Sequence, residues 1–182
     1  RSPVPDPRFG YHTLMAHDHE VPGILDVWRD LSLEQRQLVA TAFWDDAESV
    51  SQQVEAIHAI AKQFKFRPQS ILKLPIERRA RQLAGMAKIP ESVAARALVA
   101  YHLAEKRPLL ATFLDALGIR HERGVIEETL SDAPAEDRLA AAVASIAAAF
   151  PAEDVRLYLR TLAAQDPDIW RGLAALAPAR PS

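Results

Sequence analysis

The chain has 182 residues, no cysteine and a formal net charge of −2. These values exclude disulfides, cysteine-ligated zinc and thiol catalysis, and they provide no overall attraction to nucleic acid or to an anionic membrane. No apolar run approaches the roughly 18 residues that a membrane span needs. We therefore expect no membrane partner and, because cysteine is absent, a cytoplasmic location by default.

The composition favours helices throughout, because alanine and leucine are abundant and glycine, with 6 residues, is scarce. Residues 1–14 contain three prolines and no periodicity, which predicts a leader that is disordered or foreign to the native protein. Residues 178–182 contain two further prolines and are expected to form a disordered tail. Between these ends we expect a single all-α domain over residues 15–177.

Proline and capping residues mark the helix starts in the first half of the chain. Ser32 is followed by Gln35 at the spacing of a capping box, and Asp45 and Asp46 can cap a longer helix. Pro75 suits a first helical turn because it has no N–H to lose. The helices expected here span residues 22–31, 33–44, 46–64 and 76–86, with one helical turn at 70–74.

The stretch 83–118 is the predicted centre of the chain. Pro90 is expected to begin one helix, and Pro108 to break it and begin another that ends in a left-handed Gly118. Both segments carry apolar stripes at helical spacing, which predicts two antiparallel helices with facing stripes. In the second segment the stripe consists of Leu110, Phe113, Leu114 and Leu117.

Residues 119–131 lose helical periodicity, and Gly124 marks a turn, so this segment is expected to be a loop or a joint. A subdivision of the domain into 15–118 and 132–177 stays open. Helices over residues 134–150, 151–165 and 167–176 are expected to follow. The fold prediction is an all-α bundle or a stack of antiparallel helical hairpins, with about seven to nine short helices.

The segment 62–81 is strongly basic. Seven Lys or Arg residues against one glutamate give it a charge of +6, so the rest of the chain carries −8. Phe64 and Phe66 lie among the cations, and such a surface can hold phosphates or stack an unpaired base. The alternative is a solvated face that pairs with the acidic region 122–137 or with a partner protein. The seven cations are Lys62, Lys65, Arg67, Lys73, Arg78, Arg79 and Arg81.

Two histidines stand near glutamates on predicted helices. Glu55 and His58 form a Glu-x-x-His pair, whereas His102 precedes Glu105 in the reverse order. Di-iron bundles use two Glu-x-x-His pairs and two further glutamates, and no clear inward glutamates complete such a set here. We expect both histidines to flank the core and to form local hydrogen bonds. A metal site or an enzyme centred on Glu55, His58 and His102 is a weaker alternative.

His121 lies beside Glu122 and close in sequence to Glu127 and Glu128. A histidine next to carboxylates can act as a general base. However, no nucleophile motif, phosphate-binding glycine loop or oxyanion-forming turn accompanies it. The expected arrangement is an ordinary charged loop, with catalysis at His121 as a further weak alternative.

The three tryptophans bear on partner binding, since tryptophan is enriched in interaction hot spots. Trp28 and Trp170 are expected in the core, while Trp44, at a helix end, can be either a core residue or an exposed partner anchor. Because catalytic signatures are missing, the functional prediction is a non-enzymatic helical module for protein interaction, scaffolding or regulation, without a cofactor. Its partner would be a protein or a second copy of the chain. The main alternative is a nucleic-acid-binding regulator that uses residues 62–81.

Overall fold

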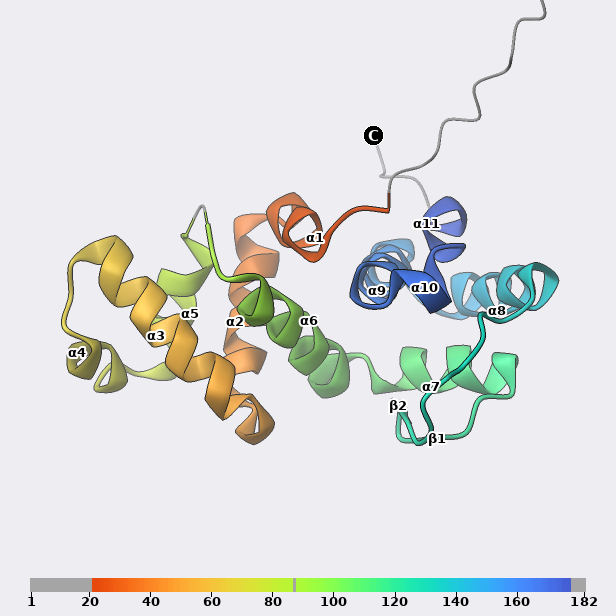
Figure 1. Ribbon diagram of the computed structural model, residues 1–182, viewed down its shortest axis with the longest axis horizontal. Helices are drawn as coiled ribbons and strands as arrows, with labels where there is room; N and C mark the ends of the chain where they lie inside the picture. The colour runs from red at the N-terminus through yellow and green to blue at the C-terminus, as the bar shows by residue number, and fades with distance from the viewer. Residues whose placement is uncertain (1–20, 87, 178–182) are drawn as a thin grey trace, which may run out of the picture.

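A computed structural model describes residues 21–86 and 88–177. This part of the chain contains eleven α-helices, eight of them of seven residues or more, so the predicted all-α class is confirmed (Figure 1). The elements are α1 (Ile24–Asp30), α2 (Leu33–Asp45), the 3-10 helix η1 (Ala47–Ser49), α3 (Val50–Phe64), α4 (Pro68–Leu72), α5 (Ile76–Ala84), α6 (Glu91–Glu105), α7 (Arg107–Leu117), β1 (His121–Glu122), β2 (Val125–Ile126), α8 (Glu136–Ala149), α9 (Ala152–Gln165), α10 (Pro167–Trp170) and α11 (Leu173–Leu176).

Local capping signals set several of the helix ends. The Ser32 hydroxyl accepts a hydrogen bond from the Gln35 N–H at 3.1 Å, and the Gln35 side chain accepts one from the Ser32 N–H at 2.9 Å, so the predicted capping box forms. Pro90 immediately precedes α6, and Gly118 ends α7 with a φ of 66°, as predicted. Asp46 caps η1 instead of α3.

The buried apolar side chains form two clusters. The N-terminal cluster draws on helices from α1 to α6, and the C-terminal cluster on helices from α7 to α11, which lie at opposite ends of the view (Figure 1). Trp28 and Trp170, with 1% and 4% of their surface exposed, occupy one cluster each, so their expected core placement is confirmed. Contacts of α9 with α1 and α6 join the clusters.

The predicted antiparallel pair in the centre of the chain is wrong. The α6 stripe packs on α1 and α2 in the N-terminal cluster, whereas the α7 stripe packs on α8 in the C-terminal cluster. Only Lys106 separates the two helices. An antiparallel helical hairpin needs a loop of about two to five residues, so the chain cannot reverse at this point. The border between the clusters therefore falls at the α6–α7 connection.

The segment after α7 contains a two-stranded antiparallel hairpin, β1–β2, within the predicted non-helical stretch. The predicted turn at Gly124 is present, and its φ of 89° is one that glycine adopts readily. A Cβ atom at this position would lie 2.9 Å from the Leu110 Cβ, so the hairpin sits directly on α7. The short strands themselves were not predicted.

Two predictions concern the chain ends and the membrane. The expected leader (residues 1–14) and tail (residues 178–182) lie outside the described residues. Within the described helices, none combines the length and the apolar character needed to cross a lipid bilayer.

Candidate functional site

The basic segment folds into the end of α3, α4 and α5, at the end of the molecule opposite α8 (Figure 1). Six of its seven cations are exposed, and only Arg79 is partly buried. Among residues 21–86 and 88–177, no ion pair joins any of the seven to a carboxylate. The charge of the six exposed cations therefore faces solvent without an acidic partner from the described chain.

A hollow of about 350 Å³ lies between α4 and α5, and we call it the basic groove. Ile71 is fully buried at its base, and Arg78 and Arg81 stand exposed along it. The cations are therefore arranged beside an apolar surface rather than scattered over a polar one. The lining residues are Phe66, Ser70, Ile71, Leu74, Arg78, Arg81 and Gln82.

Two exposed aromatic rings stand next to the basic groove. Phe64 and Phe66 are 40% and 48% exposed, and their rings stack with centroids 6.3 Å apart and planes 28° apart. Lys65 between them adopts a left-handed conformation with a φ of 58°, at the point where α3 ends. Leu72, on α4, adds a further exposed apolar side chain. Exposed large apolar side chains grouped in this way mark interaction surfaces.

Arg79 differs from the other cations because it packs against the core. Its guanidinium carbon lies 5.1 Å from the centroid of the Trp44 ring, a cation–π arrangement. Trp44 is only 5% exposed and contacts Phe43 edge to face at 5.1 Å. The structure therefore places Trp44 in the core, so Trp44 is not the exposed partner anchor that was the other predicted placement.

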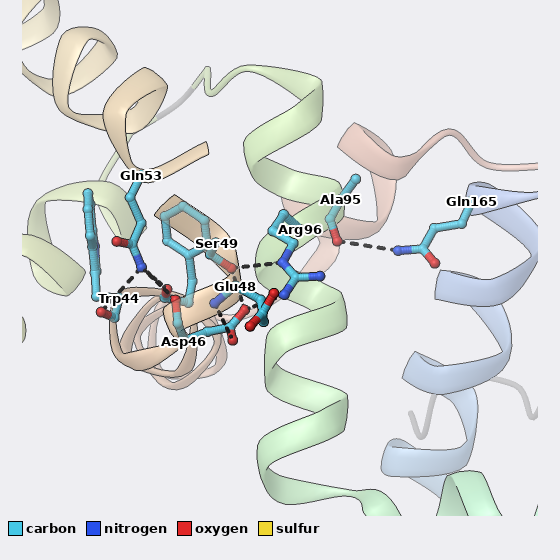
Figure 2. Close-up of polar contacts among 9 residues, drawn as sticks. Trp44, Asp46, Glu48, Ser49, Gln53, Ala95, Arg96 and Gln165 are labelled. Carbon is cyan, nitrogen blue, oxygen red and sulfur yellow. Dashed lines mark hydrogen bonds and ion pairs between the residues drawn. The ribbon is translucent and has the colours of Figure 1, made fainter. Parts of the chain in front are cut away.

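A polar network fixes the end of α2 on which Trp44 stands (Figure 2). The side-chain amide of Gln53 donates to the carbonyl oxygens of Phe43 at 2.7 Å, Trp44 at 3.3 Å and Asp46 at 3.1 Å. These bonds tie the last turn of α2 to α3. Because these bonds fix Trp44, they also fix the surface against which Arg79 of α5 packs.

Asp46 links the same junction to α6. Arg96 Nη2 lies 2.6 Å from Asp46 Oδ2, and Arg96 Nε donates to Ser49 Oγ at 2.8 Å (Figure 2). Burial raises the pKa of Asp46, but hydrogen bonds from Ser49, Arg96 and the Glu48 N–H outweigh burial and hold this pKa below its ordinary value. The carboxylate is therefore charged and structural at neutral pH.

The acidic region 122–137 does not neutralise the basic segment. It lies around β1, β2 and the start of α8, at the other end of the molecule from α4 (Figure 1). Its Glu127 and Glu128 pair instead with Arg120, at 3.6 and 3.3 Å. Pairing between these two regions within one chain, one form of the solvated-face alternative, is thus wrong because the fold separates them.

The residues of the weaker metal alternative are not brought together. Glu55 and His58 are exposed on α3, and Glu55 accepts a hydrogen bond from Ser92. His102, in contrast, is buried between α6 and α9, with its Nε2 3.3 Å from the Thr161 hydroxyl oxygen. Within the described parts of the chain, no three His, Cys, Asp or Glu side chains converge as metal ligands.

His121 has a structural environment in the hairpin. Its Nδ1 accepts a hydrogen bond from the Gly124 N–H at 3.1 Å, so its Nε2 carries the proton and faces Asp115 Oδ1 at 3.2 Å. Glu127 and Glu128, its predicted neighbours, belong to the Arg120 pairs. His121 therefore closes the turn of the hairpin.

Sequence reasoning found the cations and both phenylalanines but missed the apolar part of the basic groove. Ile71 and Leu74 lie in and just after α4, and their spacing of three residues was the available signal. Chemically, the arrangement can bind anions and apolar groups side by side. We found no match to this chain among protein-family models, curated proteins or solved structures.

Proposed function

We propose that this protein is a non-enzymatic interaction module whose basic groove binds an acidic, amphipathic segment of a partner protein. The observation that carries the proposal is the set of cations without acidic partners beside an apolar hollow. An amphipathic helix that binds a groove inserts apolar side chains and contacts the rim with polar ones. Here Phe66 and Leu74 would receive the apolar side chains, and Arg78 and Arg81 would pair with carboxylates.

Charge and exposure favour this type of partner. A buried apolar contact supplies most of the affinity, whereas charges at the rim accelerate encounter and select the partner. The segment 62–81 carries +6 and the rest of the chain −8. An acidic partner is therefore attracted by this segment and repelled by most of the remaining surface. Binding is thus directed to one end of the molecule.

Selection from a library of displayed peptides tests the proposal. Enriched peptides are expected to combine Asp or Glu with large apolar residues, and their affinity is expected to fall with rising salt. The double substitution Arg78→Glu and Arg81→Glu should abolish binding. A matched control, Arg120→Glu and Arg171→Glu, changes the net charge equally at side chains that are 77% and 72% exposed, and it should retain binding. Enriched peptides without acidic residues, or binding that survives the first double substitution, would contradict the proposal.

A second candidate function is binding of single-stranded nucleic acid. The stacked, exposed rings of Phe64 and Phe66 favour it, since aromatic faces between cations stack unpaired bases. Fluorescence anisotropy with a labelled single-stranded oligonucleotide tests it. Salt-sensitive binding that is lost in Phe64→Leu and Phe66→Leu would support nucleic acid, whereas no binding at low salt would exclude it.

A further inference from the structure

A second hollow, of about 810 Å³, lies between α2, α5 and α6 and reaches the start of α7. Two exposed apolar side chains stand along it, since Leu38 on α2 is 55% exposed and Val125 on β2 is 48% exposed. Its volume is within the range of about 300–1,000 Å³ that is typical of binding clefts. We call it the acidic hollow, and its lining includes Leu38, Asp45, Glu48, Glu77, Tyr101 and Glu105.

Carboxylates dominate the charge of the acidic hollow, because five of them line it against three cations. Two of these cations are already paired: Arg96 lies 2.6 Å from Asp46 (Figure 2), and Lys106 lies 2.9 Å from Asp154. Arg107 remains as a single positive charge. The four exposed carboxylates that no ion pair joins to a cation within residues 21–86 and 88–177 are Asp45, Glu48, Glu77 and Glu105.

A surface of opposite charge lies at the connection between α3 and α4. It consists of the exposed residues Phe64, Lys65, Phe66 and Arg67, and we call it the α3–α4 corner. Its stacked rings are apolar, and its two cations have no acidic partner within the described residues. The acidic hollow offers the complement, because exposed Leu38 lies among carboxylates there. Apolar groups and opposite charges can therefore meet in one contact.

The length of α3 prevents one chain from making this contact with itself. Asp45 and Glu48 come just before α3, whereas the α3–α4 corner begins at its last residue. A helix of 15 residues is about 22 Å long. Accordingly, the corner lies at one edge of the molecule, while α2 and α6 lie nearer its middle (Figure 1). Only a second copy of the chain can bring the two surfaces together.

We propose that copies of this protein associate by insertion of the α3–α4 corner of one copy into the acidic hollow of another. Lys65 and Arg67 then pair with the free carboxylates, and the phenylalanine rings cover Leu38. A buried phenylalanine removes about 150–250 Å² from water, so the rings supply the apolar contact and the charges direct it. Peptide binding at the basic groove is not required, because Lys65 and Arg67 do not line that groove.

Sedimentation equilibrium of the whole protein at low salt tests the proposal. The mass is expected to rise above the 20.1 kDa of one chain as the concentration increases, and to fall back as salt is added. Phe64→Ser with Arg67→Ser removes the corner, and serine suits the position of Arg67 directly before α4. Asp45→Lys with Glu105→Lys reverses charge in the hollow at the last residues of α2 and α6, where the helix dipole favours a cation.

Each double variant alone should remain monomeric. An equimolar mixture of the two should form pairs with the mass of two chains, because each variant supplies the surface that the other lacks. The control Asp132→Lys with Asp168→Lys changes the charge equally at exposed positions outside the hollow and should associate like the unaltered protein. The proposal is overturned if the unaltered protein is monomeric, if either variant associates alone, if the mixture stays monomeric, or if the control loses association.

Carbodiimide cross-linking of the unaltered protein gives a second measurement, which decides the question even if a variant does not fold. In a mixture of ¹⁴N- and ¹⁵N-labelled chains, links between copies are recognised because they join peptides with different labels. Links from Lys65 to the four free carboxylates of the hollow are expected, and links between copies that never involve these carboxylates would overturn the proposal. Arg78 and Arg81 are unchanged in every experiment, so peptide binding at the basic groove succeeds or fails separately.

Discussion

Arg96, in the middle of α6, contacts Asp46 at the end of α2 through an ion pair of 2.6 Å. Both side chains are about three-quarters buried, with exposed fractions of 26% and 23%. Arg96 also donates to Ser49, so one guanidinium connects α6 to both ends of the turn that joins α2 and α3. This contact fixes the junction of α2 and α3 against α6.

Substitution Arg96→Met keeps much of the side-chain volume but removes both hydrogen bonds. The free energy of unfolding is expected to fall by about 2 kcal/mol, because Asp46 loses a charged partner in a partly buried position. Chemical denaturation measures the change. Arg120→Met provides the control, since Arg120 is 77% exposed and its pairs contribute little. Equal losses in the two variants would contradict the structural role of Arg96.

The pKa of Asp46 is lowered from 3.8, which predicts sensitivity to acid. The Asp46 carboxylate binds a proton more readily in the unfolded chain than in the folded one. Its contribution to stability is therefore fully present above pH 3.8. That contribution is lost as the pH falls through the lower pKa of the folded state. Asp46→Asn should therefore flatten the dependence of unfolding free energy on pH below 3.8 and leave the dependence above 5 unchanged, as measured by denaturation at a series of pH values.

The buried ring of His102 should make the unfolding free energy depend on pH over a different range. Its pKa is about 3 in the fold against 6.5 in the unfolded chain, because burial disfavours the charged ring. The unfolded state alone takes up the proton between these values, so stability is fully present above 6.5 and decreases as the pH falls below it. The loss from this residue should be roughly 2 kcal/mol between pH 6.5 and about pH 5. His102→Phe should remove this slope, and His58→Phe should retain it.

Substitution of Gly124 should lower stability through the backbone conformation. Alanine at this position combines a φ of 89° with a Cβ 2.9 Å from the Leu110 Cβ, so Gly124→Ala should lower the unfolding free energy by about 1–3 kcal/mol. At Gly85, where φ is −79° and the nearest atom to a Cβ is 3.4 Å away, the same change should be close to neutral. Thermal unfolding of both variants distinguishes the two positions.

Arg79 should behave differently from its neighbours in the basic segment. Arg79→Ala removes a guanidinium that covers Trp44 and is expected to cost about 1–2 kcal/mol of stability. Arg78→Ala, at an exposed position, should change stability by less than about 0.5 kcal/mol. If the proposed interaction is correct, Arg78→Ala weakens binding of the acidic peptide without destabilising the fold. Parallel denaturation and peptide-binding measurements separate the two effects.

Several features could be predicted because they depend on residues close together in the chain. The capping box at Ser32, the start of α6 after Pro90 and the left-handed end of α7 at Gly118 each involve a few consecutive residues. Their backbone conformations follow from local sterics and hydrogen bonds. The basic charge of residues 62–81 is likewise visible without any knowledge of the fold.

The all-α class, most helix starts and the location of the cations thus followed from residues near one another in the chain. Three other features depended on contacts between distant segments: α7 packs on α8 instead of α6, Trp44 is buried under the Arg79 guanidinium, and His102 is buried against Thr161 of α9. The physical reason is that apolar stripes of Leu, Val and Ala are interchangeable as packing partners at long range. Which stripes meet is set by connection lengths and by the packing of the whole core.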